Sequence, residues 1–428
     1  MWFYVQRVLI PFQKADAAAH GRPRGNLSDL YPRWLGAREL LLHHRDPYSP
    51  EFTREIQTGY YGRPLVRTRP EDPKDQQSFA YPVYVVFLLA PTITLPFSAV
   101  QVGFRWFLVI LTAATVPLWL RALRWRPSAA TTGILVVLSI GSFPALQGIK
   151  LQKLSLVVSG LIAGGTALLA ADHLLLAGVL LALTTIKPQL AFPLTAWLVL
   201  WALSDWRRRR PFIWGFGMTA AALLAGAEYI LPGWIGRFRE AVAAYRQYTG
   251  GAGSLLDVLV TPGWGIVLTV LLLLALAAVG WRMRREPADT PAFVFAASLV
   301  LAVTVVIVPM VAPYNQLLLL PGVFLLVRDW EILWTKDRLT RAACVIAGAL
   351  IFWPWLAAMV LTVASMVAPA ASVQRAWAVP LWTSLGIPLV MLPLLGSLLA
   401  ASVRSHREHG AECGPNPPAL SRGAGPGE

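Results

Sequence analysis

Apolar runs recur along the chain from residue 104 onward, and short polar or basic stretches separate them. Runs of about 17–25 residues are long enough to cross a hydrocarbon core of about 30 Å as α-helices. A transmembrane β-barrel would instead show alternating segments of about ten residues. The pattern therefore predicts an all-α, polytopic bundle of about 11–12 transmembrane helices. The expected spans are 104–122, 129–147, 154–171, 174–187, 189–204, 212–231, 257–281, 291–309, 314–328, 342–366 and 378–402.

The basic residues set the expected orientation of these helices. Placing the segment before the first span outside puts "RALRWRP", "DWRRRR", "WRMRRE" and the tail "RSHREH" on one side. Arginine clusters mark cytoplasmic loops. We therefore expect a multi-pass protein of the cell membrane with its C-terminus in the cytoplasm.

Composition agrees with a membrane protein. Hydrophobic residues make up 56% of the chain and charged residues 14%, against about 25% charged in soluble proteins. The net charge of +15 does not indicate nucleic acid, because the arginines fall in short clusters between apolar runs. No nucleic-acid partner is expected.

Four regions follow from this layout. Residues 1–10 are expected to be the remnant of a first transmembrane helix, or alternatively a short surface anchor. Residues 11–103 are expected to form an extracytoplasmic loop with juxtamembrane helices. One of these covers 79–98, which is apolar but carries three prolines. Residues 104–402 form the bundle, and residues 403–428 have the composition of a disordered cytoplasmic tail.

Several polar residues gather on the outer side of this layout, and each has a simpler interpretation. Asp29 follows Ser28 before a helical run and could cap that helix. Asp46 in "RDPYSP" is a natural turn former, and Lys150 and Lys153 could extend from a helix end to the membrane surface. Lys187 is harder to dismiss, because it lies between two apolar helices expected to meet at "IKPQ", where a buried cation is costly without a partner.

The order of these motifs resembles a known family. "SDLYPRWLGARELLLHHRDPYSP", "FAYPVYVVFLLAP", "LQKLSLVV", "AGVLLALTTIKPQLAFPL" and "APYNQLLLLPG" follow one another between about residues 25 and 330. They are similar to the landmarks of glycosyltransferase family 87, within the GT-C superfamily. The resemblance implies transfer of a hexose, often mannose, from a polyprenyl-phosphate donor on the extracytoplasmic face. It also implies that Asp29 is the general base. The family often has Gly-Gln where this chain has Leu151-Gln152.

These observations predict a site with an aspartate base, cations for a phosphate and aromatic groups for a sugar. The reaction would invert the anomeric carbon in one displacement, with no metal and no cofactor. Its partners would be a polyprenyl-phosphate sugar donor, a glycan or lipid-linked acceptor, and membrane lipids. A lipid-linked-sugar flippase or other transporter is the alternative, supported by Lys187 at a helix break; a non-catalytic binder is a third. The candidate residues are Asp29 for catalysis; Lys150, Lys153, Lys187, Arg237 and Arg239 for the donor phosphate; and Tyr31, Trp34, Asp46, Tyr48, Gln152, Gln189, Tyr314 and Asn315 for sugar or acceptor.

Overall fold

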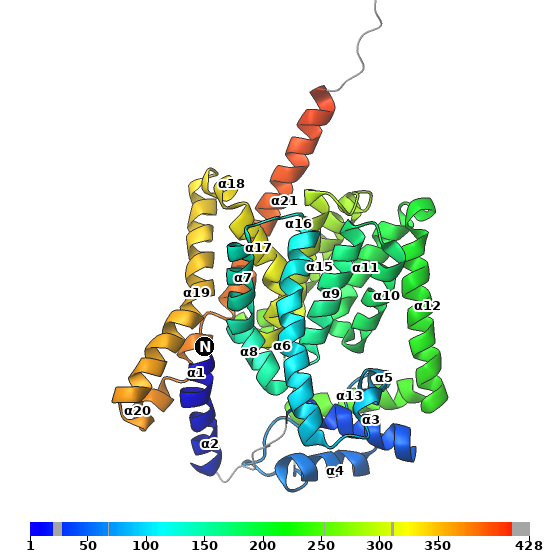
Figure 1. The fold of residues 1–428 in the computed structure, drawn as a ribbon, viewed down its shortest axis with the longest axis vertical. Coiled ribbons are helices and arrows are strands. Elements are labelled where there is room, and N and C mark those ends of the chain that lie inside the picture. Colours follow the sequence, from blue (N-terminus) through cyan, green and yellow to red (C-terminus); the bar gives the residue numbers. More distant parts are fainter. Residues whose placement is uncertain (20–27, 67, 252, 310–311, 413–428) are drawn as a thin grey trace, which may run out of the picture.

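The chain folds as a helical bundle with a layer of shorter helices at one end (Figure 1). The computed structural model describes residues 1–19, 28–66, 68–251, 253–309 and 312–412. Within these ranges the regular structure is helical and contains no strand. The all-α, polytopic prediction is confirmed.

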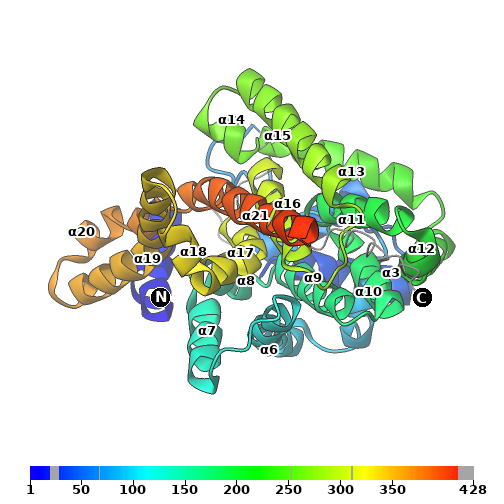
Figure 2. The same cartoon turned by 90° about the horizontal axis from the view of Figure 1, so that it is seen from above.

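Five of the described helices are long and apolar enough to cross a membrane. They account for fewer crossings than the sequence predicts, because several of the other expected spans are shorter helices. α12 and α15 are the least buried of the five, and α15 lies along one edge of the bundle when seen from above (Figure 2). The long helices are α6 (Phe97–Ala122), α12 (Trp206–Ile230), α15 (Pro262–Met283), α19 (Arg338–Val367) and a segment from α20 (Ala370–Arg375) through η5 (Val379–Leu381) into α21 (Gly386–Glu412).

The expected single span 129–147 is instead two helices bent by 53°. The first is α7 (Ala129–Gly141) and the second is α8 (Phe143–Leu151). Ser142 between them has an extended backbone, and its side chain accepts a hydrogen bond from the Ala145 amide. Pro144 in the first turn of α8 fits a helix start but not a helix interior. A serine cap followed by proline therefore ends one helix and begins the next.

Shorter apolar helices fill the centre of the bundle. The sequence predicts that two short helices meet near Lys187, and the structure confirms a break between η3 and α11 at this residue. α9 and α16 are almost entirely buried by their neighbours. The central helices are α9 (Ser155–Ala170), α10 (Leu174–Leu183) with η3 (Thr184–Ile186), α11 (Pro188–Leu203), α16 (Pro291–Ile307), and η4 (Pro313–Leu319) with α17 (Leu320–Arg328).

Two glycines let α10 and α12 pack backbone to backbone. A Cβ on Gly178 would lie 2.3 Å from the Phe212 carbonyl oxygen, and one on Gly215 would lie 2.1 Å from the Leu175 carbonyl oxygen. Small residues allow this approach between membrane helices, where van der Waals contact replaces the hydrophobic effect as the driving force.

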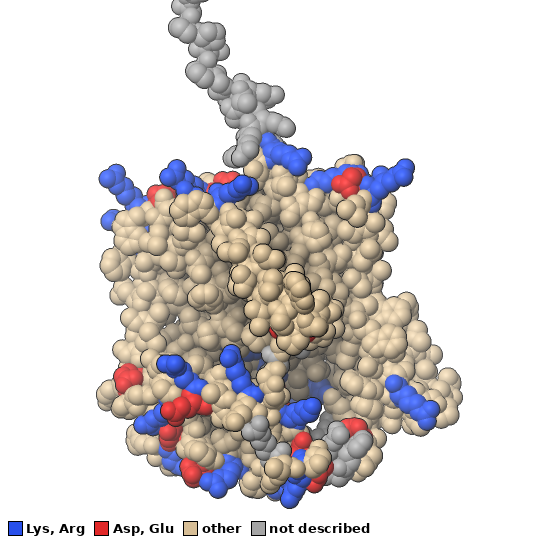
Figure 3. All heavy atoms as spheres, turned by 180° about the vertical axis from the view of Figure 1, so that it is seen from behind, with Lys and Arg blue, Asp and Glu red and all other residues tan. Residues whose placement is uncertain are grey.

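Charged side chains gather at two ends of the molecule. Figure 3 shows a broad band between them that is almost free of Lys, Arg, Asp and Glu. Because charge in a hydrocarbon core is costly, this band has the surface expected of a membrane-embedded region. The protein is a polytopic membrane protein.

The first and last helices extend beyond the boundaries expected from the sequence. α1 (Trp2–Tyr4), the π-helical turn η1 (Val5–Leu9) and α2 (Ile10–Ala19) continue one helix past residue 10. This helix packs on α19 and α20, and Phe12 stacks on Trp377 with ring centroids 4.7 Å apart. α21 likewise continues past residue 403 to Glu412, and the rest of the predicted tail lies outside the described residues.

The layer at the end of the bundle contains the first loop and one later helix. α3 (Tyr31–His43), α4 (Pro50–Tyr61), α5 (Val85–Leu89) and α13 (Trp234–Thr249) lie together at the bottom of Figure 1. The segment 79–98 holds only α5, the short η2 (Ala90–Thr92) and the start of α6, so it contributes no separate membrane-length helix. The remaining short helices are α14 (Leu255–Leu259) and α18 (Trp330–Trp334).

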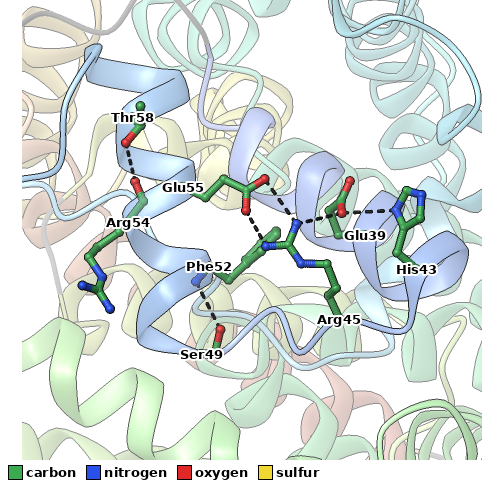
Figure 4. A network of polar contacts seen from close by, with 8 residues as sticks. All are labelled: Glu39, His43, Arg45, Ser49, Phe52, Arg54, Glu55 and Thr58. Atoms are coloured by element: carbon green, nitrogen blue, oxygen red, sulfur yellow. Dashed lines mark hydrogen bonds and ion pairs between the residues drawn. The ribbon is translucent and has the colours of Figure 1, made fainter.

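An ion-pair network on the outside of this layer joins α3 to α4. Arg45 bonds to Glu39 at 3.0 Å and to Glu55 at 2.5 Å (Figure 4). Its guanidinium also lies over the Phe52 ring, 5.4 Å from the centroid. Exposed pairs of this kind contribute about 0–1 kcal/mol each, so we assign the network a structural role.

Candidate active site

The site forms where the segment directly before α3 meets the end of α8. The Asp29 amide donates to the Leu151 carbonyl oxygen at 3.1 Å. The Ser28 hydroxyl donates to the side-chain oxygen of Gln152. Gln152 has a left-handed backbone (φ 52°) that ends α8, and its side-chain Nε2 donates to the Gln101 carbonyl oxygen. These contacts hold Asp29 against the bundle.

The Asp29 carboxylate is buried and has two side-chain partners. Its Oδ2 pairs with the ammonium of Lys153, and its Oδ1 accepts from Gln77 Nε2 at 3.1 Å. The residue is 6% exposed. No side chain caps the N-terminus of α3, so the capping interpretation of Asp29 is not supported.

The surroundings of Asp29 keep it ionised. Burial by itself raises the pKa of Asp29, but the charges of Lys153 and Arg33 and the hydrogen bonds from Lys153 and Gln77 outweigh burial and lower it. Burial likewise lowers the pKa of Lys153, but the Asp29 charge outweighs burial and raises it. The pair is therefore carboxylate and ammonium at neutral pH.

A second lysine lies in the same cluster. Lys187, at the break before α11, donates to the Ser155 hydroxyl, which in turn donates to Asn315 Oδ1 at 3.1 Å. The Tyr314 ring lies close to both lysines: its centroid is 5.0 Å from Lys153 Nζ and 5.3 Å from Lys187 Nζ. The cluster thus collects two cations from distant parts of the chain.

Four further residues belong to the cluster although they were not among those predicted from the sequence: Ser155, described above, and Arg33, Tyr81 and Gln77. Arg33 donates to the Asp29 carbonyl oxygen, and its guanidinium lies 4.7 Å from the centroid of the Tyr81 ring. Gln77 reaches Asp29 from a loop with no helical pattern. The spacing of Asp29 and Arg33 by four residues was a usable signal for a shared helix face; nothing in the sequence indicated Gln77.

Other candidate residues lie elsewhere. Trp34 and Tyr48 are buried, with their polar atoms bonded to the carbonyl oxygens of Thr92 (3.2 Å) and Tyr81 (2.6 Å). Asp46 accepts from the Tyr48 amide at 2.9 Å, as expected of a turn. The remaining positions are as follows: Tyr31 packs edge-on against Phe97, Lys150 donates to Gln13 at 3.0 Å, Arg237 pairs with Asp46 at 2.9 Å, and Arg239 and Gln189 are exposed.

Two apolar cavities adjoin the residues that flank the cluster. One, of about 620 Å³, is lined by α5, α6, α9 and α10 and includes Tyr84 and Ile186, the neighbour of Lys187. The other, of about 500 Å³, is lined mainly by α7, α17 and α19 and includes Gln316, the neighbour of Asn315. In the part of the chain that the structure describes, no three His, Cys, Asp or Glu side chains lie together as a metal site.

Comparison with known families identifies the chain. A sequence model of glycosyltransferase family 87 matches residues 79–309, which is more than half of the chain. The chain belongs to glycosyltransferase family 87. This glycosyltransferase has no match among curated proteins and none among solved structures. The matched region contains Tyr81, Lys153 and Lys187, whereas Asp29 and Gln77 precede it and Tyr314 follows it.

Proposed function

We propose that this glycosyltransferase moves a hexose, with mannose as the first candidate, from a polyprenyl-phosphate donor to a hydroxyl of a glycan or lipid-linked acceptor. The reaction takes place on the extracytoplasmic face of the cell membrane. The observation that carries the proposal is the buried Asp29 carboxylate, which lies among Lys153, Arg33 and Lys187 at the end of an apolar bundle.

The two lysines suit the phosphate of a lipid-linked donor. The contacts of Lys187 with Ser155 and the Tyr314 ring supply no negative charge. A buried cation is stabilised by a paired anion, and the donor phosphate would supply one. Cations aimed at the phosphate also stabilise the charge that develops on it as the glycosidic bond breaks.

The apolar cavity beside Ile186 suits the prenyl chain of the same donor. It begins next to Lys187 and continues along α6 and α9 toward Arg121. A lipid lying in this cavity would have its phosphate near the two lysines. The donor would therefore use the bilayer-facing side of the bundle for its chain and the outer layer for its sugar.

Asp29 is the proposed general base. It would take the proton of the acceptor hydroxyl while the hydroxyl oxygen bonds to the anomeric carbon. The bond from that carbon to the phosphate oxygen would break, and polyprenyl phosphate would leave with the electron pair. One such displacement inverts the anomeric carbon. The proton would then pass from Asp29 to water.

Lys153 would link donor binding to the strength of this base. In the structure it pairs with Asp29, and this pairing lowers the pKa of the carboxylate. A carboxylate with a lowered pKa is a weaker base. A donor phosphate that draws Lys153 away would raise the pKa of Asp29 when the base is needed.

The transporter alternative depended on Lys187 at a helix break. In the structure Lys187 shares the Tyr314 ring with Lys153, the partner of Asp29. Its position at the break therefore has an explanation within the proposed active site, and a separate transport role is not needed to account for it.

The test compares transfer from labelled polyprenyl-phosphate-mannose in membranes that contain the full chain or its Asp29→Asn variant. Removing a positioned base lowers the rate by about 10²–10⁴-fold. Because Asp29→Asn also leaves Lys153 buried without its partner, folding must be measured alongside, by thermal unfolding of the purified chain.

A double variant separates the two effects. Losing one partner of a buried pair costs about 3–5 kcal/mol, whereas replacing both charges is often neutral. Asp29→Asn with Lys153→Met should therefore unfold near the wild-type temperature and still lack transfer. Transfer by a folded double variant at the wild-type rate would reject Asp29 as the base.

A further inference from the structure

Buried polar atoms without partners occur on two residues that bond to Asp29. Ten buried side-chain nitrogen or oxygen atoms of the described residues make no hydrogen bond. Four of them belong to Arg33 and to the run Gln76, Gln77 and Ser78. Buried polar atoms are usually paired, and an unpaired one costs free energy. Arg33 and Gln77 both bond to Asp29, and their unpaired atoms point to a bound group that pairs with them.

The amide of Gln77 has a defined orientation. Its Nε2 donates to Asp29 Oδ1 at 3.1 Å and to Asp75 Oδ2 at 2.7 Å. The opposite orientation would direct its oxygen at two carboxylates, which accept but do not donate. Oε1 must therefore point away from them, and it is a buried acceptor without a donor.

The backbone of Gln77 is also unusual. Its φ is 49°, in the left-handed region that residues other than glycine rarely adopt. The residue is 4% exposed. Strained conformations of this kind cluster at functional sites. The chain accepts the strain at the residue whose side chain bridges the two carboxylates.

Arg33 provides the complementary group. One of its terminal nitrogens donates to the Asp29 carbonyl oxygen, its central carbon lies over the Tyr81 ring, and its Nε is a buried donor without an acceptor. An unpaired acceptor and an unpaired donor thus belong to two residues that both bond to Asp29. A hydroxyl group can donate to one and accept from the other.

We propose that Gln77 and Arg33 form a hydroxyl-binding subsite beside Asp29, which recognises a sugar with two adjacent hydroxyls. One hydroxyl reacts at Asp29, and its neighbour donates to Gln77 Oε1 and accepts from Arg33 Nε. The subsite would select the orientation of the acceptor sugar and hence the position that is glycosylated. This inference rests on the proposed function, because Asp29 must be the base for the reacting hydroxyl to lie there.

The direct test is a cryo-EM map of the full chain in lipid nanodiscs with polyprenyl phosphate, the unreactive leaving group of the donor, and saturating methyl α-D-mannoside. We expect a sugar oxygen within about 3.2 Å of Gln77 Oε1. A sugar at Asp29 with only water or protein on Gln77 Oε1 overturns the subsite and leaves the proposed function intact. Sugar density absent from Asp29 overturns both.

Kinetics of transfer to methyl α-D-mannoside give a second test. Gln77→Asn keeps a residue that tolerates the left-handed backbone but shortens the side chain, so it should raise KM for the mannoside about tenfold. In the pH profile of kcat/KM, the acid limb should also move to higher pH, because Asp29 loses a hydrogen bond that lowers its pKa. A loss of stability with unchanged KM and pH profile would mean a structural role only.

Thr195→Val is the matched control. The Thr195 hydroxyl in α11 is another buried polar atom without a partner, and it has no contact with the Asp29 cluster among those described. Its replacement should leave KM and the pH profile unchanged. An equal rise in KM in this variant would show that unpaired buried groups affect the assay in general, and the subsite would be rejected.

Discussion

Two aspartate–cation pairs in the outer layer have the same chemistry and different surroundings. The side chains of Lys153 and Asp29 are 16% and 7% exposed, whereas those of Arg237 and Asp46 are 43% and 29% exposed. The first pair joins the loop to the bundle, and the second joins the loop to α13. The comparison shows that burial, and not the presence of a carboxylate and a cation, makes one of these pairs the candidate for chemistry.

The reason is electrostatic. Water screens an exposed pair, which then contributes about 0–1 kcal/mol. In a buried site each charge interacts strongly with its neighbours, and the pKa of Asp29 responds to Lys153, Arg33 and Gln77. A substrate that enters such a site changes the properties of the base, which an exposed pair does not allow.

The largest expected effect separates the two aspartates. Asp29→Asn should lower transfer by about 10²–10⁴-fold, because the acceptor proton has no base. Asp46→Asn should change transfer less than about twofold, since asparagine keeps the turn acceptor and only a screened pair is lost. Rates are measured with labelled donor at matched amounts of folded protein. Equal losses in both variants would refute the distinction.

The next effect separates the two cations. Lys153→Met should lower kcat about 10–100-fold, because one phosphate contact is lost. With Lys153 gone, Asp29 loses the strongest interaction that lowers its pKa, so the pKa rises and a larger fraction of the base is protonated in acid. The loss should therefore be greater at about pH 5 than at about pH 8. A variant with an unshifted acid limb would show that Lys153 does not control Asp29.

Lys187→Met should have a smaller effect, mainly on the donor. Lys187 contacts Ser155 and the Tyr314 ring and makes no described hydrogen bond to Asp29. We expect KM for polyprenyl-phosphate-mannose to rise about tenfold, because a charge-assisted contact of about 1.5 kcal/mol is lost. The acid limb should shift less than in Lys153→Met, because Lys187 interacts with Asp29 by charge alone. A change in kcat with unchanged donor KM would place Lys187 outside the phosphate site.

The smallest effect belongs to the exposed cation. Arg237→Met should lower the free energy of unfolding by about 0.2–1 kcal/mol, and the difference should shrink at high salt as the pair is screened. Thermal unfolding at two salt concentrations measures it. A loss of several kcal/mol would mean that the contact of α13 with the first loop is more important than its exposure indicates.

Part of the site was predictable because short local motifs in the sequence contain its residues. Asp29, Lys153, Lys187, Tyr314 and Asn315 were each selected, and the structure brings them into one cluster through the contacts of Lys153 and Ser155. Trp34 and Tyr48 were selected for the same outer layer. The sequence does not show that the polar atoms of these two side chains bond to backbone carbonyl oxygens within the protein.

The sequence by itself determined the class of the protein. Apolar runs dictate helices in a membrane because every backbone polar group must be paired within the segment, and the motif order indicated the family that the comparison confirmed. Hydropathy could not separate membrane-length spans from the short buried helices α9 and α16, because both are apolar.

Only the tertiary structure decided which polar residues meet. Lys153 is 124 residues from Asp29 in the chain, and Gln77 comes from a loop with no regular pattern. Such contacts depend on where α8 ends and where the loop returns to the bundle. Hydrophobic periodicity records which face of a helix is buried, but a pairing of distant polar atoms leaves no period in the sequence.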